Sequence, residues 1–469
     1  MGKYHAYQVY EDTHNEFVSE LPQGWVLSKF KYEVDYVEGP GILANDFHEA
    51  GVPLLRIQNV KDRFTSGDIK TYLDPQKVKD KWEHFKTKTG DLLISGSAST
   101  DLVTEVTEQY EGAVPYTGLI RLRAKQDRTD KNYVRYFVQS ELFKKQIDNL
   151  KTGSTIQHFG PIHLQQIVYP SALVSEQTQI ANFLDHETAK IDTLIEKQQQ
   201  LIKLLKEKRQ AVISHAVTKG LPSVNGEAQA PMKDSGVEWL GEVPEHWVVS
   251  PIKHLLRQKK GAVKAGPFGS HLKNSDMDGG DVKVITQKNV IKKNLSIGDS
   301  FISEQKYREL SGFTIEKEDV LITTRGTIGR TCVYSDEAVA ILHPCLIRMQ
   351  CDETKVIPEL LALIIQDSGY AMEQILVKSN ATTIEVIYSD NLVNTEICVP
   401  KTIDEQVRLL EFVELETDKF DSLVRKAESA ISLMQERRTA LISAAVTGKI
   451  DVRNWQAPTS ENQALEQTA

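Results

Sequence analysis

Two long segments of the chain carry apolar residues at intervals of three and four positions. They cover residues 175–218 and 404–447, and they open on Ser175 and Asp404, residue types that cap helix N-termini. Neither segment contains proline or glycine. The pattern therefore predicts two uninterrupted helices, each about 65 Å long at 1.5 Å per residue.

Helices of this length cannot bury a whole apolar stripe on one small neighbouring module. Two of them in one chain most simply bury their stripes on each other, as an antiparallel intramolecular coiled coil. Such a pair would hold the rest of the chain as two modules at opposite ends, with approximate twofold symmetry. Packing of each helix on its own module, or between two copies of the chain, is the alternative.

The two helical segments are copies of one another and align without a gap. Residues of the first copy that recur unchanged in the second are Glu176-Gln177, Phe183, Glu187-Thr188, Lys190, Asp192, Leu194, Glu207, Arg209 and Ile213-Ser214. The regions that precede them are related more distantly. Their matching segments are Glu20-Leu21-Pro22 with Glu242-Val243-Pro244, Ile57–Val60 with Gln287–Val290, Gly90–Ile94 with Glu318–Ile322, and Leu119–Leu122 with Leu346–Met349. The chain is therefore a tandem duplication of a globular module followed by a helix.

Each globular module alternates short β-type runs with turn residues and helical stretches. The β-type runs include VPLLRIQNV and DVKVITQKNV, and the helical stretches are YVRYFVQSELFKKQID and PELLALIIQDSGYAMEQIL. The expected fold is α+β (mixed α/β), with two pseudo-symmetric globular domains separated by the antiparallel helices. The predicted boundaries are 1–174 for module 1, 175–219 for the first helix, 220–236 for a linker, 237–403 for module 2, 404–449 for the second helix, and 450–469 for a polar tail.

The composition is that of an ordinary globular protein. Of 469 residues, 40% are hydrophobic and 26% charged, and the net charge is −9. An acidic chain is not coated with DNA-binding charge, so any nucleic-acid surface must be local. No apolar run is long enough to span a bilayer and the start of the chain is polar, so we expect a cytoplasmic protein without membrane contact. The four cysteines form no CxxC pair, and His343 with Cys345 and Cys351 matches no common zinc spacing, so no metal site is predicted.

No catalytic motif stands out. The chain lacks the phosphate-binding GxxxxGK[ST] sequence, HExxH, GxSxG, and the Pro-Pro-aromatic element of amino-methyltransferases. Scattered carboxylates leave a self-sufficient nuclease open as an alternative. A coiled-coil scaffold without DNA specificity is a second alternative.

Two similar but unequal modules suit an asymmetric two-part ligand, and double-stranded DNA is the natural candidate. Glycine-rich turns allow close approach to phosphate, while Arg, Lys, Gln, Asn, Ser and His side chains suit phosphates and base edges. The predicted DNA-binding residues of module 2 are Lys264, Ser270, His271, Lys273, Gln287, Lys288, Asn289, Arg325 and Arg330. Those of module 1 are Arg56, Gln58, Asn59, Ser154 and Gln157.

Several motifs together resemble the specificity subunits of type I restriction-modification systems. They are Met232–Trp247, the turn Gly266–Ser270 with Leu272-Lys273, Asp319–Ile322 with Arg325–Gly329, and the Glu-Gln pairs that open both helices. The resemblance covers essentially the whole chain. Module 1 departs from it, since Ser97–Thr100 stands where module 2 has Arg325–Gly329, and Gly39-Pro40-Gly41 matches the Gly-Pro-Phe-Gly turn only in part.

The resemblance implies two target-recognition domains and a non-catalytic role. It implies that the chain binds two methyltransferase subunits and two translocase-nuclease subunits and directs them to a bipartite DNA site. S-adenosylmethionine, ATP and Mg²⁺ would then be bound by the partner subunits and not by this chain.

Overall fold

The computed structural model describes residues 4–61, 63–96, 102–150, 159–222, 230–377 and 386–457. The chain divides into two compact units. Unit 1 comprises residues 1–199 and 428–469, and unit 2 comprises residues 200–427. The division passes through both long helices, so each unit contains one sheet-rich module and one segment of each helix.

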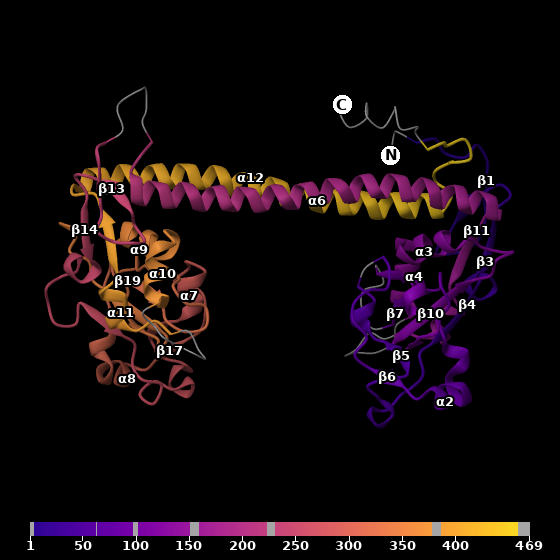
Figure 1. Cartoon of the computed structure of the whole chain (residues 1–469), viewed down its shortest axis with the longest axis horizontal. Helices are drawn as coiled ribbons and strands as arrows, with labels where there is room; N and C mark the ends of the chain where they lie inside the picture. Colours follow the sequence, from indigo (N-terminus) through magenta and orange to yellow (C-terminus); the bar gives the residue numbers. More distant parts are fainter. Residues whose placement is uncertain are drawn as a thin grey trace. The chain divides into compact units, whose positions relative to one another are not determined.

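The two long helices are α6 (Val174–Lys219) and α12 (Ile403–Val446), drawn in magenta and yellow in Figure 1. They run antiparallel, as one ion pair in each unit shows. Arg438 Nε lies 3.0 Å from Asp192 Oδ1 in unit 1, and Arg209 Nε lies 3.1 Å from Asp421 Oδ1 in unit 2. The predicted fold class, with two modules and a pair of antiparallel helices, is confirmed.

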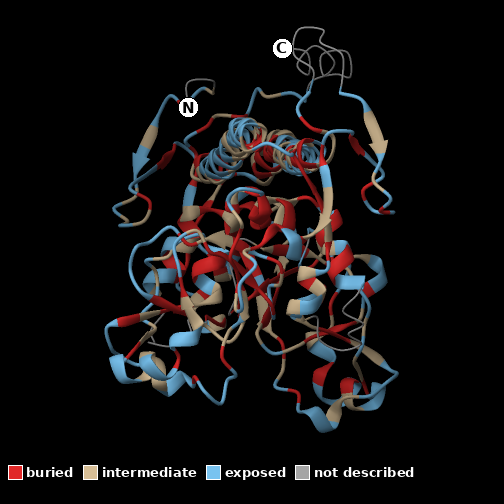
Figure 2. Ribbon diagram, turned by 90° about the vertical axis from the view of Figure 1, so that its left-hand side faces the viewer, coloured by how far each residue is buried: buried red, intermediate tan, exposed pale blue. Residues whose placement is uncertain are grey.

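The helices bury less of their apolar stripe than a continuous coiled coil would. Leu205 and Ala427 are buried, but Leu194, Leu201 and Leu423 are between 43% and 48% exposed. A seam between two helices covers only a narrow strip, which is narrower than the stripe in the sequence. Figure 2 shows exposed residues on the outer helix faces and buried residues in the interior of the modules.

Unit 1 is built around four small sheets. Two of them are two-stranded, β1 (Tyr10–Asp12) with β2 (Glu20–Pro22), and β11 (Val168–Ser171) with β3 (Val26–Lys29). The four-stranded sheet has the order β4 (Val34–Glu38), β10 (Leu119–Ala124), β7 (Leu92–Ser95), β8 (Val103–Glu105). The last sheet has the order β6 (Tyr72–Leu73), β5 (Val52–Leu55), β9 (Val114–Pro115). The helices of its module are α1 (Phe30–Glu33), α2 (Pro75–Lys77), α3 (Lys131–Gln139), α4 (Glu141–Leu150) and α5 (Pro161–Leu164).

Unit 2 repeats this plan with one additional strand, β18, at the edge of its last sheet. Its two-stranded sheets are β12 (Met232–Asp234) with β13 (Glu242–Pro244), and β14 (Val248–Pro251) with β23 (Glu396–Val399). The first four-stranded sheet has the order β15 (Val263–Ala265), β22 (Leu346–Met349), β19 (Val320–Thr323), β20 (Thr331–Val333). The second has the order β17 (Phe301–Ile302), β16 (Val282–Ile285), β21 (Ala340–Leu342), β18 (Thr314–Ile315). The helices of its module are α7 (Gln287–Ile291), α8 (Glu304–Glu309), α9 (Pro358–Asp367), α10 (Tyr370–Val377) and α11 (Ser389–Val393).

Each predicted helical stretch inside a module is in fact two helices. Ser140 ends α3, where its Oγ donates to Phe137 O, and the same Oγ accepts from Phe143 N in α4. Gly369, with φ +83°, separates α9 from α10, which lie at 68° to each other. A serine cap and a left-handed glycine interrupt a helix even where the apolar pattern continues.

Both units use an equivalent part-buried contact, between a glutamate and a tryptophan, to attach a module to a long helix. In unit 1, Glu176 Oε1 accepts from Trp25 Nε1 at 3.2 Å and from Tyr7 Oη at 2.6 Å. In unit 2, Glu405 Oε1 accepts from Trp247 Nε1 at 2.9 Å. The glutamate of each recurring Glu-Gln pair thus accepts a hydrogen bond from the tryptophan that follows the first hairpin of its module.

The neighbouring glutamines, Gln177 and Gln406, are completely buried. Gln177 Oε1 accepts from Asp130 N at the start of α3, and Gln406 Oε1 accepts from Ile357 N at the start of α9. A buried amide with all its groups bonded fixes one geometry, because any displacement leaves a polar group without a partner.

Each core is completed by the far end of the other long helix. Leu441, Ile442 and Val446 of α12 pack into the core of unit 1, while Ile213 and Val217 of α6 pack into the core of unit 2. Each unit is therefore assembled from segments distant in the sequence.

Candidate nucleic-acid interface

In unit 2, the carboxyl ends of four strands meet at one edge. β16 and β21 are parallel, and β15 and β19 both pair antiparallel with β22. Hydrogen bonds join the loops that follow: Gly266 N donates to Leu346 O at 2.8 Å, Thr324 N to Cys345 O at 2.9 Å, and the Gln287 amide to Arg325 O. Loops that start at residues 266, 286, 324 and 343 therefore form one surface, which we call the strand-end surface of module 2.

The first of these loops begins at a glycine that the fold itself requires. A Cβ atom at Gly266 would lie 2.1 Å from His343 O, whereas a Cβ at Gly269 would meet nothing within 4 Å. Gly266 is needed for the approach of two backbone segments of the module. Of the two glycines of this loop, Gly269 is the one with open space beside its Cα.

A tight hairpin between β19 and β20 presents the two arginines of the surface. Gly326 and Gly329 have φ of +69° and +73°, which favours glycine. Thr323 Oγ1 donates to Thr327 O at 2.6 Å and accepts from Arg330 N at 3.0 Å, closing the turn from inside. Arg325 and Arg330 are exposed on this hairpin.

The structure brings most predicted residues of module 2 to this surface. Those that are exposed are Ser270, His271, Lys273, Lys288, Arg325 and Arg330. Lys264 and Gln287 are half-buried, and the Lys264 ammonium lies 4.8 Å from the centroid of the Phe313 ring. Lys264 therefore has a partner within the module.

Module 1 has the same construction. A Cβ atom at Gly39 would lie 2.2 Å from Pro115 O, as Gly266 approaches His343, and Tyr116 N donates to Leu55 O at 2.8 Å. The Arg56 guanidinium lies 4.7 Å from the Phe47 ring centroid and 5.3 Å from that of Tyr116. Gln58 is exposed beside it. Ser154 and Gln157, like residues 97–100, lie outside the described residues.

Asn59 and Asn289 are not available to read bases, so this part of the prediction is wrong. Both side chains are 1% exposed. Asn59 accepts from Arg56 N at 3.1 Å and donates to Ser66 O, and Asn289 accepts from Thr286 N at 2.9 Å and donates to Ile297 O at 2.7 Å. Each asparagine closes a helical turn at its strand end, where the sequence predicted a continuing strand.

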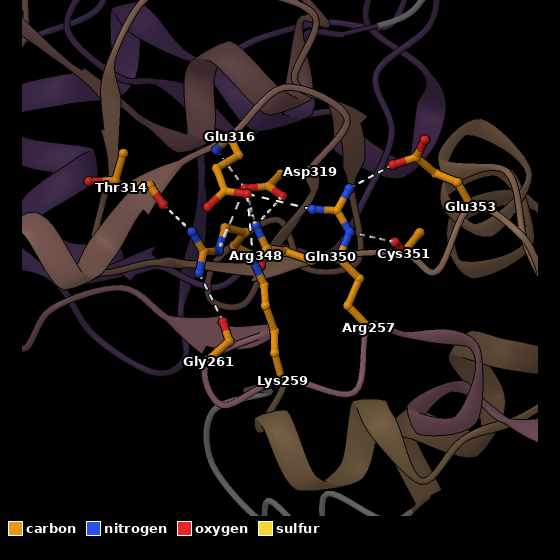
Figure 3. A network of polar contacts seen from close by, with 10 residues as sticks. All are labelled: Arg257, Lys259, Gly261, Thr314, Glu316, Asp319, Arg348, Gln350, Cys351 and Glu353. Atoms are coloured by element: carbon orange, nitrogen blue, oxygen red, sulfur yellow. Dashed lines mark hydrogen bonds and ion pairs between the residues drawn. The ribbon is translucent and has the colours of Figure 1, made fainter.

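A second basic cluster of module 2, at residues 253–260, lies at the opposite end of β15 and β22. Arg257 Nη2 donates to Glu353 Oε1 at 2.6 Å, and Lys259 Nζ lies 3.7 Å from Glu316 Oε2 (Figure 3). These cations are paired with carboxylates of their own module and away from the strand-end surface.

Figure 3 also shows the buried ion pair beneath this cluster, between Arg348 on β22 and Asp319. Arg348 Nε lies 3.6 Å from Asp319 Oδ2, and the two side chains are 8% and 2% exposed. Burial raises the pKa of the Asp319 carboxyl, although hydrogen bonds from Glu316 N and Gln350 and the charge of Arg348 oppose the change. Module 1 holds the equivalent pair, Arg121 with Asp91.

Sequence reasoning missed three aromatic or imidazole residues of the strand-end surfaces. Phe268 is 79% exposed, Tyr116 stacks against Arg56, and His343 closes the loop after β21, where its Nδ1 accepts from Cys345 N at 3.2 Å. Burial lowers the pKa of His343. Phe268 lies within the Gly266–Ser270 turn, of which only Ser270 was predicted as a DNA contact, and its place in that turn was the available signal.

Within the ranges described, no group of three or more His, Cys, Asp and Glu side chains is placed to hold a metal ion. Cys351 is buried, and burial raises the pKa of its thiol to about 12. No single helix among the described residues is long and apolar enough to cross a membrane, and α9 with α10 meets the criteria of length and composition only as a bent pair.

The fold defines a class of duplicated proteins in which two sheet-rich modules alternate with two long antiparallel helices. Residues 244–427 match the family model of the type I restriction modification DNA specificity domain. The chain is 21% identical to the EcoBI specificity subunit of Escherichia coli, over 93% of this chain and 88% of that protein. It is 20% identical to the StySPI specificity subunit of Salmonella potsdam, over 93% and 91%. Residues 244–427 thus carry the type I restriction modification DNA specificity domain, and the chain is similar to whole type I specificity subunits over 93% of its length.

Solved structures share the fold. The HsdS subunit from Thermoanaerobacter tengcongensis aligns over 94% of this chain and 100% of its own, with a TM-score of 0.51 and 13% identity. A chain from a structure described as the complex assembly and conformational transition of the type I R-M system covers 92% of this chain and 99% of its own, with a TM-score of 0.61 and 14% identity.

Proposed function

We propose that this chain is the non-catalytic DNA-recognition subunit of a type I restriction-modification complex, and that each strand-end surface contacts one half of a bipartite, asymmetric DNA site. The observation that carries the proposal is that the two modules share the same buried contacts but differ in the loops that they expose. The hydrogen bonds from tryptophan to glutamate and the buried Arg-Asp ion pairs recur in both units. By contrast, Arg325 and Arg330 of module 2 have no arginine counterparts in module 1.

The residues of the surface divide into two roles. Lys273, Lys288, Arg325 and Arg330 are exposed cations suited to phosphates, which fix position on the duplex without reading its sequence. Ser270 and His271 of module 2, with Gln58 of module 1, offer donors and acceptors to base edges.

Arg56 of module 1 and Lys264 of module 2 each lie over an aromatic ring of their own module, which restricts the position of the cation. Gln287 orients the hairpin through its bond to Arg325 O. Ser154 and Gln157 remain predicted contacts of module 1.

The partners of the proposed complex are two methyltransferase subunits and two translocase-nuclease subunits, located with the chain in the cytoplasm. S-adenosylmethionine, ATP and Mg²⁺ would be bound by these partners. Their surfaces would also supply much of the positive charge that an acidic recognition subunit lacks.

The proposal is tested by measuring DNA binding of the full chain, co-expressed with its methyltransferase subunit, over a range of salt concentrations. We expect sequence-selective binding, and we expect the logarithm of the association constant to fall linearly with the logarithm of the salt concentration. Arg325→Gln and Arg330→Gln should each weaken binding to all sequences and reduce the slope by about one. Arg308→Gln, which changes an exposed arginine on α8, is the matched control and should leave the slope unchanged.

Two results would contradict the proposal. Binding that is independent of both salt and sequence would identify a scaffold. Cleavage of DNA by the chain alone with Mg²⁺ would identify a self-sufficient nuclease.

A further inference from the structure

Each unit has a groove where its module meets the two long helices. In unit 1 the groove has a volume of about 310 Å³ and is bordered by β8, α3 and both long helices. In unit 2 a groove of about 550 Å³ is bordered by the corresponding elements, β20, α9 and the same two helices. The charged side chains that line the groove of unit 1 are Lys61, Arg63, Arg135, Asp185, Asp192 and Arg438. The charged lining in unit 2 is mainly acidic, with Glu359, Asp367, Glu411 and Glu414 beside Arg209 and Lys293.

One ion pair in the groove of unit 1 belongs to the helix pair and recurs in unit 2. Arg438 Nε lies 3.0 Å from Asp192 Oδ1, as Arg209 Nε lies 3.1 Å from Asp421 Oδ1. Among the described residues that line the groove of unit 1, the remaining carboxylate is that of Asp185. It faces three cations, so the groove keeps an excess of positive charge.

Two of these cations share a single oxygen of Asp185. Arg135 Nη2 donates to Asp185 Oδ1 at 2.5 Å, the same oxygen accepts from Tyr136 Oη at 2.7 Å, and Arg63 Nη2 lies 3.5 Å from it. The Arg135 side chain is only 5% exposed, and its Nε has no hydrogen-bond partner in the part of the chain that the structure describes. A buried N–H group of a cation is unfavourable without an acceptor, so the site lacks an anion.

Two of the cations have uncharged residues at the matching positions of unit 2. Because Asp130 and Ile357 make the same contact to a buried glutamine, Arg135 corresponds to Ala362. Lys61 follows Asn59-Val60 as Ile291 follows Asn289-Val290. The excess of positive charge is therefore a property of unit 1 and not a requirement of the shared fold.

The groove adjoins the strand-end surface of module 1. Lys61 and Arg63 follow the helical turn Ile57–Asn59, which begins where β5 ends, and both are exposed. Arg63 O accepts from Glu105 N at 2.7 Å, which joins this segment to β8. An anion can therefore reach the groove from the surface that we assign to DNA.

We propose that the groove of unit 1 is a phosphate-binding site, in which Arg63 and Arg135 bind a phosphate of the DNA backbone and Lys61 attracts it at the entrance. The inference rests on the proposed function. Phosphate oxygens suit this site because they accept the N–H groups of guanidinium in pairs. Module 1, which has no arginine where the hairpin of module 2 carries Arg325, thus contacts the backbone from a different element.

The first experiment measures the salt dependence of DNA binding by the full chain bound to its methyltransferase subunit, on a site selected from a randomised double-stranded library. Lys61→Gln and Arg63→Gln should each reduce the slope by about one. The matched control is Arg128→Gln, which changes an exposed arginine of unit 1 beyond the end of β10. Since Leu119 pairs with Ser95, that end lies opposite the strand-end surface, and the slope should not change.

A second variant tests the groove without removing the buried arginine. Ala189 is exposed, lines the groove, and has Asp418 as its counterpart in the second helix copy, so the helix accommodates an acidic residue there. Ala189→Asp should weaken DNA binding about fivefold at low salt, because its charge repels the phosphate. Ala189→Asn, which adds a similar volume without charge, should bind as wild type.

Neutral methylphosphonate linkages, placed at one phosphate at a time, locate the contact. One linkage should weaken binding by the wild-type protein and cause no further loss in Arg63→Gln, so that the two changes are not additive. Arg325→Gln should show the same behaviour with a linkage in the other half-site. The two arginines would then identify the half-site that each module contacts.

Three outcomes would overturn the inference. The first is an unchanged slope in both Lys61→Gln and Arg63→Gln. The second is equal DNA binding by Ala189→Asp and Ala189→Asn. The third is calorimetric binding of inorganic phosphate to the complex without DNA, lost in Arg63→Gln, while every methylphosphonate linkage affects wild type and Arg63→Gln alike, which would identify a site for a free anion. A wild-type complex that selects no sequence would instead contradict the proposed function itself.

Discussion

Replacing Arg348 with methionine removes the guanidinium that lies beside the buried Asp319 carboxylate. The substitution keeps much of the side-chain volume but loses the charge and the bonds that Arg348 donates to Thr314 O and Gly261 O. Asp319 would retain bonds from Glu316 N at 2.7 Å and Gln350 at 3.0 Å. Because removal of one partner leaves a buried charge uncompensated, we expect a loss of about 3–5 kcal/mol in the free energy of unfolding of unit 2.

The duplicated module supplies the internal control. Arg121 also donates to two backbone carbonyls, those of His84 and Lys86, but its partner Asp91 keeps a bidentate pair with Arg123 at 2.7 and 2.6 Å. Arg121→Met therefore loses hydrogen bonds without leaving an unpaired carboxylate. We expect it to cost about 1.5–3 kcal/mol in unit 1.

The difference should depend on pH. Burial already raises the pKa of Asp319, and loss of the neighbouring positive charge raises it further. A carboxyl group with a raised folded-state pKa favours the folded state at low pH, and this contribution is lost as the pH rises through that pKa. The penalty of Arg348→Met should be largest at neutral pH and shrink as the pH falls toward the ordinary aspartate value of about 3.9.

Because each substitution acts within one of the two compact units, the assay is hydrogen exchange followed by mass spectrometry across a denaturant series, read separately for β19 with β22 and for β7 with β10. Adding Asp319→Asn to Arg348→Met should recover part of the loss, since it removes the buried charge. Equal destabilisation of the two units by the two single substitutions, or a penalty for Arg348→Met that does not change with pH, would refute the reasoning.

Two further predictions concern the backbone. Inserting seven residues into both long helices, after Gln199 and before Glu428, leaves the contacts within each unit intact and adds about 10 Å of helix. If the helices set the spacing of the half-sites, selected DNA sites should gain about three base pairs of spacer at 3.4 Å each, and an unchanged spacer would contradict this. Gly266→Ala should lower the melting temperature of unit 2 because its Cβ would clash with His343 O, whereas Gly269→Ala should leave stability unchanged. A calorimetric scan that shows equal effects would exclude a structural requirement at Gly266.

The large-scale fold was predictable because its signals are long and repeated. The helical periodicity continues over residues 175–218 and 404–447. Because the two halves of the chain are related in sequence, each predicts the same arrangement of a globular module followed by a helix. The interruptions inside the modules were not predictable from this periodicity. Ser140 and Gly369 end helices through a side-chain bond and a positive φ, while the apolar residues around them continue the pattern.

The exposed leucines of the long helices show a similar limit. Leu194 and Leu423 occupy matching positions in the two copies, and both were expected on the buried stripe. The structure leaves them 48% and 46% exposed. Periodicity identifies the apolar side of a helix but not how much of that side a partner covers.

The candidate site was harder to predict, and the duplication explains why. Asn59 and Asn289 were predicted as DNA contacts because amide side chains suit base edges, but both recur in the two copies, and the structure shows that each closes a buried turn. Gln177 and Gln406 recur for the same reason. A residue that recurs in both modules can do so because the shared fold requires it, and not because it contacts a ligand. Residues that contact different DNA sequences would instead be exposed, lie at the strand ends and differ between the copies, as Arg325 and Arg330 do.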